Sequence, residues 1–170
     1  KPVGDKDALC GKPLICPSLG MYDSLDNKVE TKKLFDKFGI PTPKWSFVNN
    51  GKKMLEKPIA NSAGGLGIKL AINNAGTGYF LEEYIEGCQS IGLQFFIYDE
   101  VEFICADEML FHNNGNQLFT FRAQRNVPLE ELPATLITDC FVLLEHLASR
   151  GYRGLIGIDA LVKNGDYFML

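Results

Sequence analysis

The chain has 170 residues, of which 46% are hydrophobic, and its 17 basic and 21 acidic side chains give a net charge of −4. This composition predicts a globular protein with an ordinary core, and it argues against nucleic acid as the main partner because no basic stripe dominates. No apolar run approaches the ~20 residues that span a membrane, and no signal-peptide pattern opens the chain, so we expect a cytoplasmic protein that does not bind membranes.

From the N-terminus, hydrophobic spacing predicts one helix and several short strands in the first half of the chain. The helix runs over about residues 28–38, follows turn and helix-capping residues at 20–27, and ends at Gly39. The predicted strands are bounded by turn residues and cover residues 13–17, 45–48, 54–57, 68–72 and 79–85.

The second half predicts an antiparallel sheet and a second helix. The helix covers about residues 134–150, and two-residue turns are expected at Asp99-Glu100 and Asn164-Gly165. The predicted strands cover residues 90–98, 101–110, 117–121, 154–162 and 167–170. Runs of antiparallel strands beside a few helices predict an α+β domain.

A glycine-rich loop joins two predicted strands within residues 56–69, EKPIANSAGGLGIK. Gly64, Gly65 and Gly67 allow backbone N–H groups to approach an anion closely, and Lys57 beside the loop adds a mobile charge suited to phosphate. The loop lacks both the Gly-Lys-Ser/Thr of a Walker motif and the G-x-G-x-x-G fingerprint of a dinucleotide fold. A hairpin turn with glycines at positive φ is the alternative interpretation.

Cysteine and histidine residues do not indicate a metal site or a nucleophile. The five cysteines include no C-x-x-C pair, and we interpret them as reduced thiols. Neither His112 nor His146 has a second histidine or a cysteine at ligand spacing, so we expect neither a zinc site nor Ser-His catalysis.

Four segments resemble the ATP-grasp superfamily in type and order, and the closest likeness is to carboxylate–amine ligases and carbamoyl-phosphate-synthetase-like members. The segments are DNKVETKKLFDKFGIPTP (26–43), EKPIANSAGGLGIK (56–69), FLEEYIEG (80–87) and GYRGLIGIDALVKNGDYFML (151–170). The resemblance implies an ATP-grasp fold, in which two α+β subdomains, a mobile lid and a larger sheet subdomain, grip ATP between them. Residues 1–44 would then be the remnant of an N-terminal subdomain with a linker helix, 45–83 the lid, and 84–170 the C-terminal subdomain, truncated at its end.

The resemblance also assigns roles to individual residues. Lys28 matches the first nucleotide-contacting lysine, and Lys57 matches the second, which contacts the phosphates. The run from Gly64 to Gly67 matches the loop that closes over the triphosphate, and Asp159 matches the first carboxylate that binds Mg²⁺ (or Mn²⁺). The hinge segment that reads adenine matches Glu82, Glu83, Tyr84 and Ile85.

The acids among these residues stand in apolar surroundings, which favours the assignments and leaves one alternative open. Glu82 and Glu83 interrupt an apolar run before Ile85. A buried and unpaired acid is costly, so one of them would need a hydrogen-bond donor, which the adenine amino group could provide. Asp159 stands among apolar strand residues and likewise needs a cation or donors, which magnesium would supply. The alternative for both sites is strand alternation that places the acids on a solvent-exposed face.

Two arginines are candidate catalytic residues. Arg122 and Arg125 leave the end of a predicted strand together, a position suited to the γ-phosphate or to a substrate carboxylate. The alternative is a pair of solvated loop cations.

The sequence departs from the family pattern in two places. Gln89 stands at about the position where members often have a glutamate for the ribose hydroxyls, although an amide can also bond a diol. The connections 49–54 and 72–79 are short for an ATP-grasp lid. The second metal ligands are expected beyond Leu170.

We therefore predict an ADP-forming, carbon–nitrogen bond-forming ligase that uses ATP and Mg²⁺ (or Mn²⁺). It would activate a small-molecule carboxylate as an acyl phosphate, which an amine or a similar nucleophile then attacks. A homodimer is compatible with this function. The alternative function is a catalytically inactive ATP-binding regulatory module.

Overall fold

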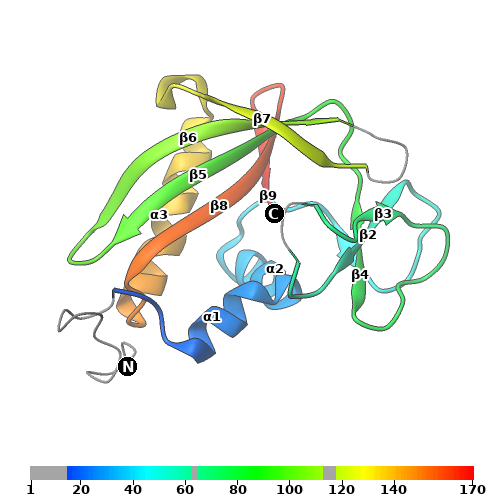
Figure 1. Cartoon of the computed structure of the whole chain (residues 1–170), viewed down its shortest axis with the longest axis horizontal. Helices are drawn as coiled ribbons and strands as arrows, with labels where there is room; N and C mark the ends of the chain where they lie inside the picture. The colour runs from blue at the N-terminus through cyan, green and yellow to red at the C-terminus, as the bar shows by residue number, and fades with distance from the viewer. Residues whose placement is uncertain (1–14, 63–64, 113–117) are drawn as a thin grey trace.

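The computed structural model describes residues 15–62, 65–112 and 118–170, whose arrangement Figure 1 shows. The helices are α1 (Leu19–Asp26), α2 (Lys28–Phe38) and α3 (Ala134–Ser149), with a short 3-10 turn at Leu129–Glu131. The strands are β1 (Trp45–Ser46), β2 (Met54–Pro58), β3 (Lys69–Leu70), β4 (Tyr79–Glu83), β5 (Gln89–Ile97), β6 (Val101–His112), β7 (Thr120–Asn126), β8 (Gly154–Lys163) and β9 (Asp166–Met169). Within these described ranges, no helix has the length and apolar character needed to cross a membrane.

The strands form two antiparallel sheets, which confirms the predicted α+β class. The larger sheet has five strands in the order β7-β6-β5-β8-β9, and α3 covers one of its faces (Figure 1). Its core side chains alternate along β5, where Ile91, Leu93, Phe95 and Ile97 are buried, because successive strand residues face opposite sides. The other face of β5 carries Ser90, Gly92 and Gln94, and Ser90 on this face lines the cavity described below.

The smaller sheet has four strands in the order β1-β4-β2-β3 and a small core of Met54, Leu55, Phe80 and Leu81. Strands β1 to β4 fall within residues 45–83, and β5 to β9 fall within residues 84–170. The division into separate subdomains at these boundaries stays a prediction.

Local signals fix helix α2 at the bounds predicted from the sequence. The Asn27 side chain accepts hydrogen bonds from the backbone N–H groups of Val29 at 3.1 Å and Glu30 at 3.2 Å, so it caps the first turn. Gly39 has a φ of 68° and ends the helix in the left-handed conformation. The backbone N–H of Lys28 also donates to the Ile59 carbonyl at 2.8 Å, which attaches the start of α2 to the smaller sheet.

The segment after α2 runs between the two sheets and is hydrogen-bonded to both. The Pro41 carbonyl accepts a hydrogen bond from the N–H of Met169 in β9 at 2.7 Å. Three residues later, the Lys44 carbonyl accepts from the N–H of Glu83 in β4 at 2.8 Å. The helix and this linker therefore hold the sheets in a defined relation.

The structure corrects four predicted elements. Residues 19–26 form helix α1, capped by Ser18, where the sequence predicted only a turn. Of the strand predicted at 13–17, residues 15–17 belong to no strand, and residues 13 and 14 lie outside the described part of the chain. The strand predicted to end at residue 121 continues as β7 to Asn126, so Arg122 and Arg125 lie inside it instead of following it. Strand β4 ends at Glu83, which leaves Tyr84 and Ile85 in the connection to β5.

Candidate functional site

A cavity of about 950 Å³ lies between the two sheets and is walled by residues of both. Most of the site residues predicted from the sequence line this cavity. These are Lys28, Lys57, Gly65, Glu82, Glu83, Tyr84, Ile85, Gln89 and Asp159. Gly67, Arg122 and Arg125 do not line it, and Gly64 lies outside the described residues.

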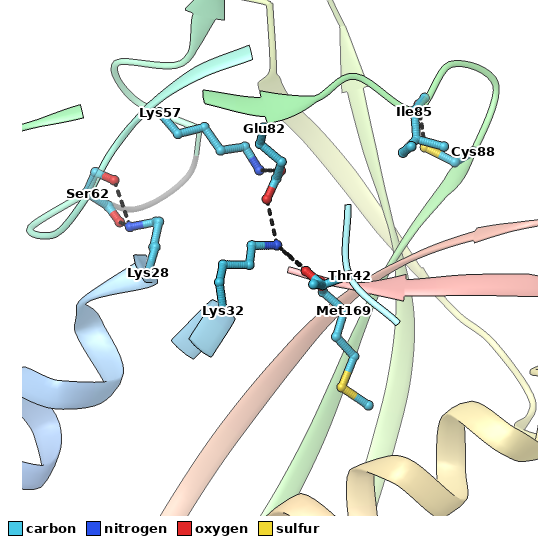
Figure 2. A network of polar contacts seen from close by, with 9 residues as sticks. All are labelled: Lys28, Lys32, Thr42, Lys57, Ser62, Glu82, Ile85, Cys88 and Met169. Carbon is cyan, nitrogen blue, oxygen red and sulfur yellow. Dashed lines mark hydrogen bonds and ion pairs between the residues drawn. The ribbon is translucent and has the colours of Figure 1, made fainter. Parts of the chain in front are cut away.

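Three residues that line the cavity, a buried carboxylate and two lysines, are paired with one another (Figure 2). One oxygen of Glu82 forms an ion pair with Lys57, and the other pairs with Lys32 at 2.6 Å. The side chains of Lys32 and Glu82 are only 1% and 2% exposed. Burial alone would raise the pKa of Glu82, but the two lysines outweigh it and hold that pKa below its usual value. Glu82 is therefore ionised, with both oxygens occupied.

Lys28 places a second cation beside the glycine loop. Its ammonium group donates to the Ser62 hydroxyl at 3.1 Å, at the start of the loop (Figure 2). Partial burial lowers the pKa of Lys28, and nearby Lys57 lowers it further, while Asp26 and Glu82 act in the opposite direction. A phosphate between Lys28 and Lys57 would relieve their mutual repulsion.

The glycine loop makes close backbone contacts that a side chain would disturb. Gly65 has a φ of 77°, and a Cβ there would lie 2.8 Å from the Phe119 carbonyl oxygen, on the segment that leads into β7. Gly67 has a φ of 78°, and a Cβ there would lie 2.9 Å from the Pro58 ring. Both positions therefore favour glycine, because positive φ is strained for other residues.

The connection between β4 and β5 forms one edge of the cavity. Glu83, the last residue of β4, forms an ion pair with the exposed Lys52 at 3.2 Å. Its side chain is partly exposed, unlike that of Glu82. The Tyr84 ring lies under the ammonium group of Lys53, 4.3 Å from the ring centroid. The Ile85 carbonyl accepts a hydrogen bond from the Cys88 thiol at 3.1 Å (Figure 2). Gln89 follows at the exposed start of β5.

Asp159 stands on the opposite wall, in β8. It pairs with Gly92 in the register of β5 and β8, and a Cβ on Gly92 would lie 3.6 Å from its carboxylate. Asp159 is exposed to solvent in the cavity. Desolvation by the protein around it nevertheless raises the pKa of its carboxyl, and the positive charge of Lys57 partly offsets that rise. Within the described part of the chain, no three His, Cys, Asp or Glu side chains gather as a metal site, and Asp159 lines the cavity.

The two candidate catalytic arginines lie on β7, at the edge of the larger sheet. Both are exposed, and Arg125 forms an ion pair with Glu108 at 2.6 Å. Because neither side chain lines the cavity, their part in catalysis stays a prediction.

The sequence profile of the ATP-grasp domain matches residues 25–170. The chain belongs to the ATP-grasp family. No curated protein matches the sequence significantly. Members of the ATP-grasp family are usually ADP-forming ligases, so nucleotide binding and ligase-type chemistry are the functions to test in this cavity.

Solved structures support the same fold at low sequence identity. An ATP-grasp superfamily protein from Archaeoglobus fulgidus is 15% identical with a TM-score of 0.69, and the match covers 93% of this chain and 48% of that one. D-alanine–D-alanine ligase from Bacillus anthracis is 16% identical with a TM-score of 0.62, covering 91% and 58%. The biotin carboxylase domain of Hydrogenobacter thermophilus 2-oxoglutarate carboxylase, in complex with MgADP, ADP and bicarbonate, is 17% identical with a TM-score of 0.68, covering 94% and 42%. This ATP-grasp chain thus spans about half the length of these proteins.

The sequence interpretation missed Lys32, whose side chain is almost completely buried in the site. Its signal was available, because Lys32 lies four residues after Lys28 and therefore on the same side of α2. It also stands between Val29 and Phe35 in the buried stripe of the helix, where a lysine requires partners.

Proposed function

We propose that the cavity binds ATP with Mg²⁺ and that the protein is an ATP-dependent ligase. One observation carries the proposal: Lys28 and Lys57 stand beside the glycine loop on one wall of the cavity, and the Asp159 carboxylate stands on the other. Ammonium groups and backbone N–H groups suit the phosphates, and a carboxylate suits a metal ion that bridges phosphate oxygens. Membership of the ATP-grasp family makes this the leading function.

The edge formed by the connection between β4 and β5 is the proposed place of the nucleoside. Ile85 and Tyr84 would provide apolar and aromatic surface for adenine, and backbone groups there would read its polar edge. Gln89, exposed at the start of β5, would bond the ribose hydroxyls through its amide. Glu83 would contribute mainly through its backbone, since its side chain pairs with Lys52.

Asp159 is the proposed protein ligand for magnesium. Mg²⁺ commonly takes one or two carboxylates, with the remaining positions filled by water and substrate phosphates. Asp159 fits that role, because it is exposed to solvent and lines the cavity. When bound, the ion would neutralise charge on the phosphates.

In the proposed reaction, a substrate carboxylate oxygen attacks the γ-phosphorus of ATP, and ADP leaves. The nitrogen of an amine, or a similar nucleophile, then attacks the acyl carbon, and phosphate leaves with the bonding electron pair. Lys28 and Lys57 would hold the triphosphate and stabilise the charge that develops on its oxygens. Arg122 and Arg125 are proposed to bind the γ-phosphate or the carboxylate, and the turnover of Arg122→Ala and Arg125→Ala variants would test that role.

The test combines binding and turnover. Calorimetry should detect binding of an ATP analogue with Mg²⁺ to the unmodified protein, and Lys57→Met should weaken it while Lys69→Met, at an exposed lysine of the same sheet, should not. A phosphate-release screen of carboxylates against amines, with bicarbonate included, should then find a substrate pair. No ATP binding at all would refute the proposal, whereas binding without turnover by the complete protein would favour a regulatory module.

A further inference from the structure

All three N–H donors of the Lys32 ammonium group are occupied by acceptors of the protein. Its ammonium group pairs with Glu82 at 2.6 Å and donates to the Thr42 hydroxyl at 2.6 Å and to the Met169 carbonyl at 3.2 Å (Figure 2). A lysine ammonium has three N–H donors, so these three acceptors satisfy it completely. Although Lys32 borders the cavity, it has no donor left for a ligand.

Lys32 changes the net charge of the group that it forms with Glu82 and Lys57. Glu82 with Lys57 alone would be a neutral pair, and the attraction of Lys57 for an anion would be largely cancelled. Lys32 brings a second positive charge to the same carboxylate, so the three groups together carry a net charge of about +1. The extra positive charge acts on the cavity through Lys57, because Lys57 is the more exposed of the two lysines and Lys32 is bonded to the protein on the side away from the cavity.

We propose that Lys32 is a positioning residue for phosphate binding: it fixes and neutralises Glu82, so that Lys57 presents an uncompensated charge to the phosphates of the nucleotide. This inference rests on the proposed function and adds a residue to it that does not touch the ligand. Lys32 thus affects the ligand indirectly, through its ion pair with Glu82.

The anchors of Lys32 connect the phosphate site to the larger sheet. The Thr42 hydroxyl accepts from Lys32 and donates to the Met169 carbonyl at 2.7 Å, and that same carbonyl accepts from Lys32. Met169 is the last residue of β9, while Glu82 and Lys57 belong to β4 and β2 of the smaller sheet. The orientation of Lys57 therefore depends on a chain of bonds that begins on β9.

The experiment measures the affinity for ATP and for adenosine by calorimetry in three variants. Lys32→Met removes the charge at similar side-chain length. Lys33→Met is the matched control, because Lys33 is the next residue of α2 and its side chain is 56% exposed. The double variant Lys32→Met/Glu82→Gln removes one positive and one negative charge, which restores the surplus of about +1.

We expect Lys32→Met to weaken ATP binding about tenfold or more, the size of one lost charged contact. Adenosine binding and the Lys33→Met control should change less than about twofold. The double variant should recover ATP affinity to within about threefold of the unmodified protein, a rescue that a purely structural role of Lys32 cannot give.

The other outcomes overturn the proposal in distinguishable ways. Equal losses of ATP and adenosine binding in Lys32→Met would mean a structural role, and a double variant as weak as the single one would refute the charge argument. If Lys32→Met does not fold, as judged by thermal unfolding, the double variant decides alone through its ratio of ATP to adenosine affinity. An unmodified protein that binds no ATP would refute the proposed function itself.

Discussion

Replacing Gly65 by alanine tests whether the glycine loop shapes the nucleotide site. The backbone at Gly65 has a φ of 77°, which costs a non-glycine residue roughly 1–2 kcal/mol. The added Cβ would also lie 2.8 Å from the carbonyl oxygen and 3.1 Å from the Cβ of Phe119, distances that the loop or the chain before β7 must relieve by moving. We therefore expect Gly65→Ala to displace the loop in addition to lowering stability.

Gly78, in the turn that leads into β4, provides a matched control. Its φ is 81°, but a Cβ there would meet no atom within 4 Å. Gly78→Ala should lose about 1–2 kcal/mol of stability from the backbone alone, whereas Gly65→Ala should lose more. The difference between the two free energies of unfolding, measured with urea, isolates the contact with Phe119.

ATP affinity separates loop shape from overall stability. Gly65→Ala should weaken ATP binding by about tenfold, since a displaced loop loses the equivalent of one good hydrogen bond to a charged group. Gly78→Ala should bind ATP like the unmodified protein. Equal ATP affinity in the two variants would refute the idea that the Gly65–Phe119 contact sets the geometry of the site.

Two further predictions concern charged groups of the cavity. Lys57→Ala should cost on the order of 1.5–3 kcal/mol of ATP binding free energy, as for a charged hydrogen bond, with a far smaller effect on adenosine; calorimetry that finds ATP affinity intact would contradict the phosphate role. Asp159→Asn should abolish the strengthening of ATP binding by Mg²⁺ but leave binding in EDTA nearly unchanged. A Mg²⁺ effect that persists in that variant would exclude Asp159 as the ligand.

Where local chemistry determines an element, the sequence predicts it well. Helix α2 has both its capping asparagine and its terminating glycine in the sequence, and its predicted bounds agree with the structure. The β5–β6 hairpin follows from two apolar strands around a short turn, although residues 98–100 form a three-residue connection where the sequence predicted two. The cavity residues Lys28, Lys57 and Asp159 were identified by family motifs and by the cost of charge among apolar neighbours, and the fold brings them to one cavity.

Features set by distant contacts were not predictable in the same way. Helix α1 spans only eight residues and none of them is fully buried; Met21 and Leu25 pack against the core at its edge, so its apolar signal in the sequence is short. Strand β7 is polar and exposed along most of its length, and its register comes from pairing with β6. The bond from Lys32 to the Met169 carbonyl joins residues 137 positions apart, which no local pattern can indicate.

The buried network also limits how this ATP-grasp domain can close over a ligand. Moving the smaller sheet alone would pull Glu82 in β4 away from Lys32, and leaving a buried charge without its partner costs about 3–5 kcal/mol. Moving it together with α2 would break the bond from Lys32 to the Met169 carbonyl in β9. The exposed part of the glycine loop has no such anchor, because residues 66 and 67 are solvent-exposed.

Closure should therefore involve the loop while β4 stays fixed. In hydrogen exchange, the amides of β4 should be slow with and without an ATP analogue, since β4 is bonded between β1 and β2. The amides of residues 65–67 should become slow only when the analogue saturates the site. If β4 gains as much protection as the loop, the smaller sheet moves as a unit and the network must break and reform during the cycle.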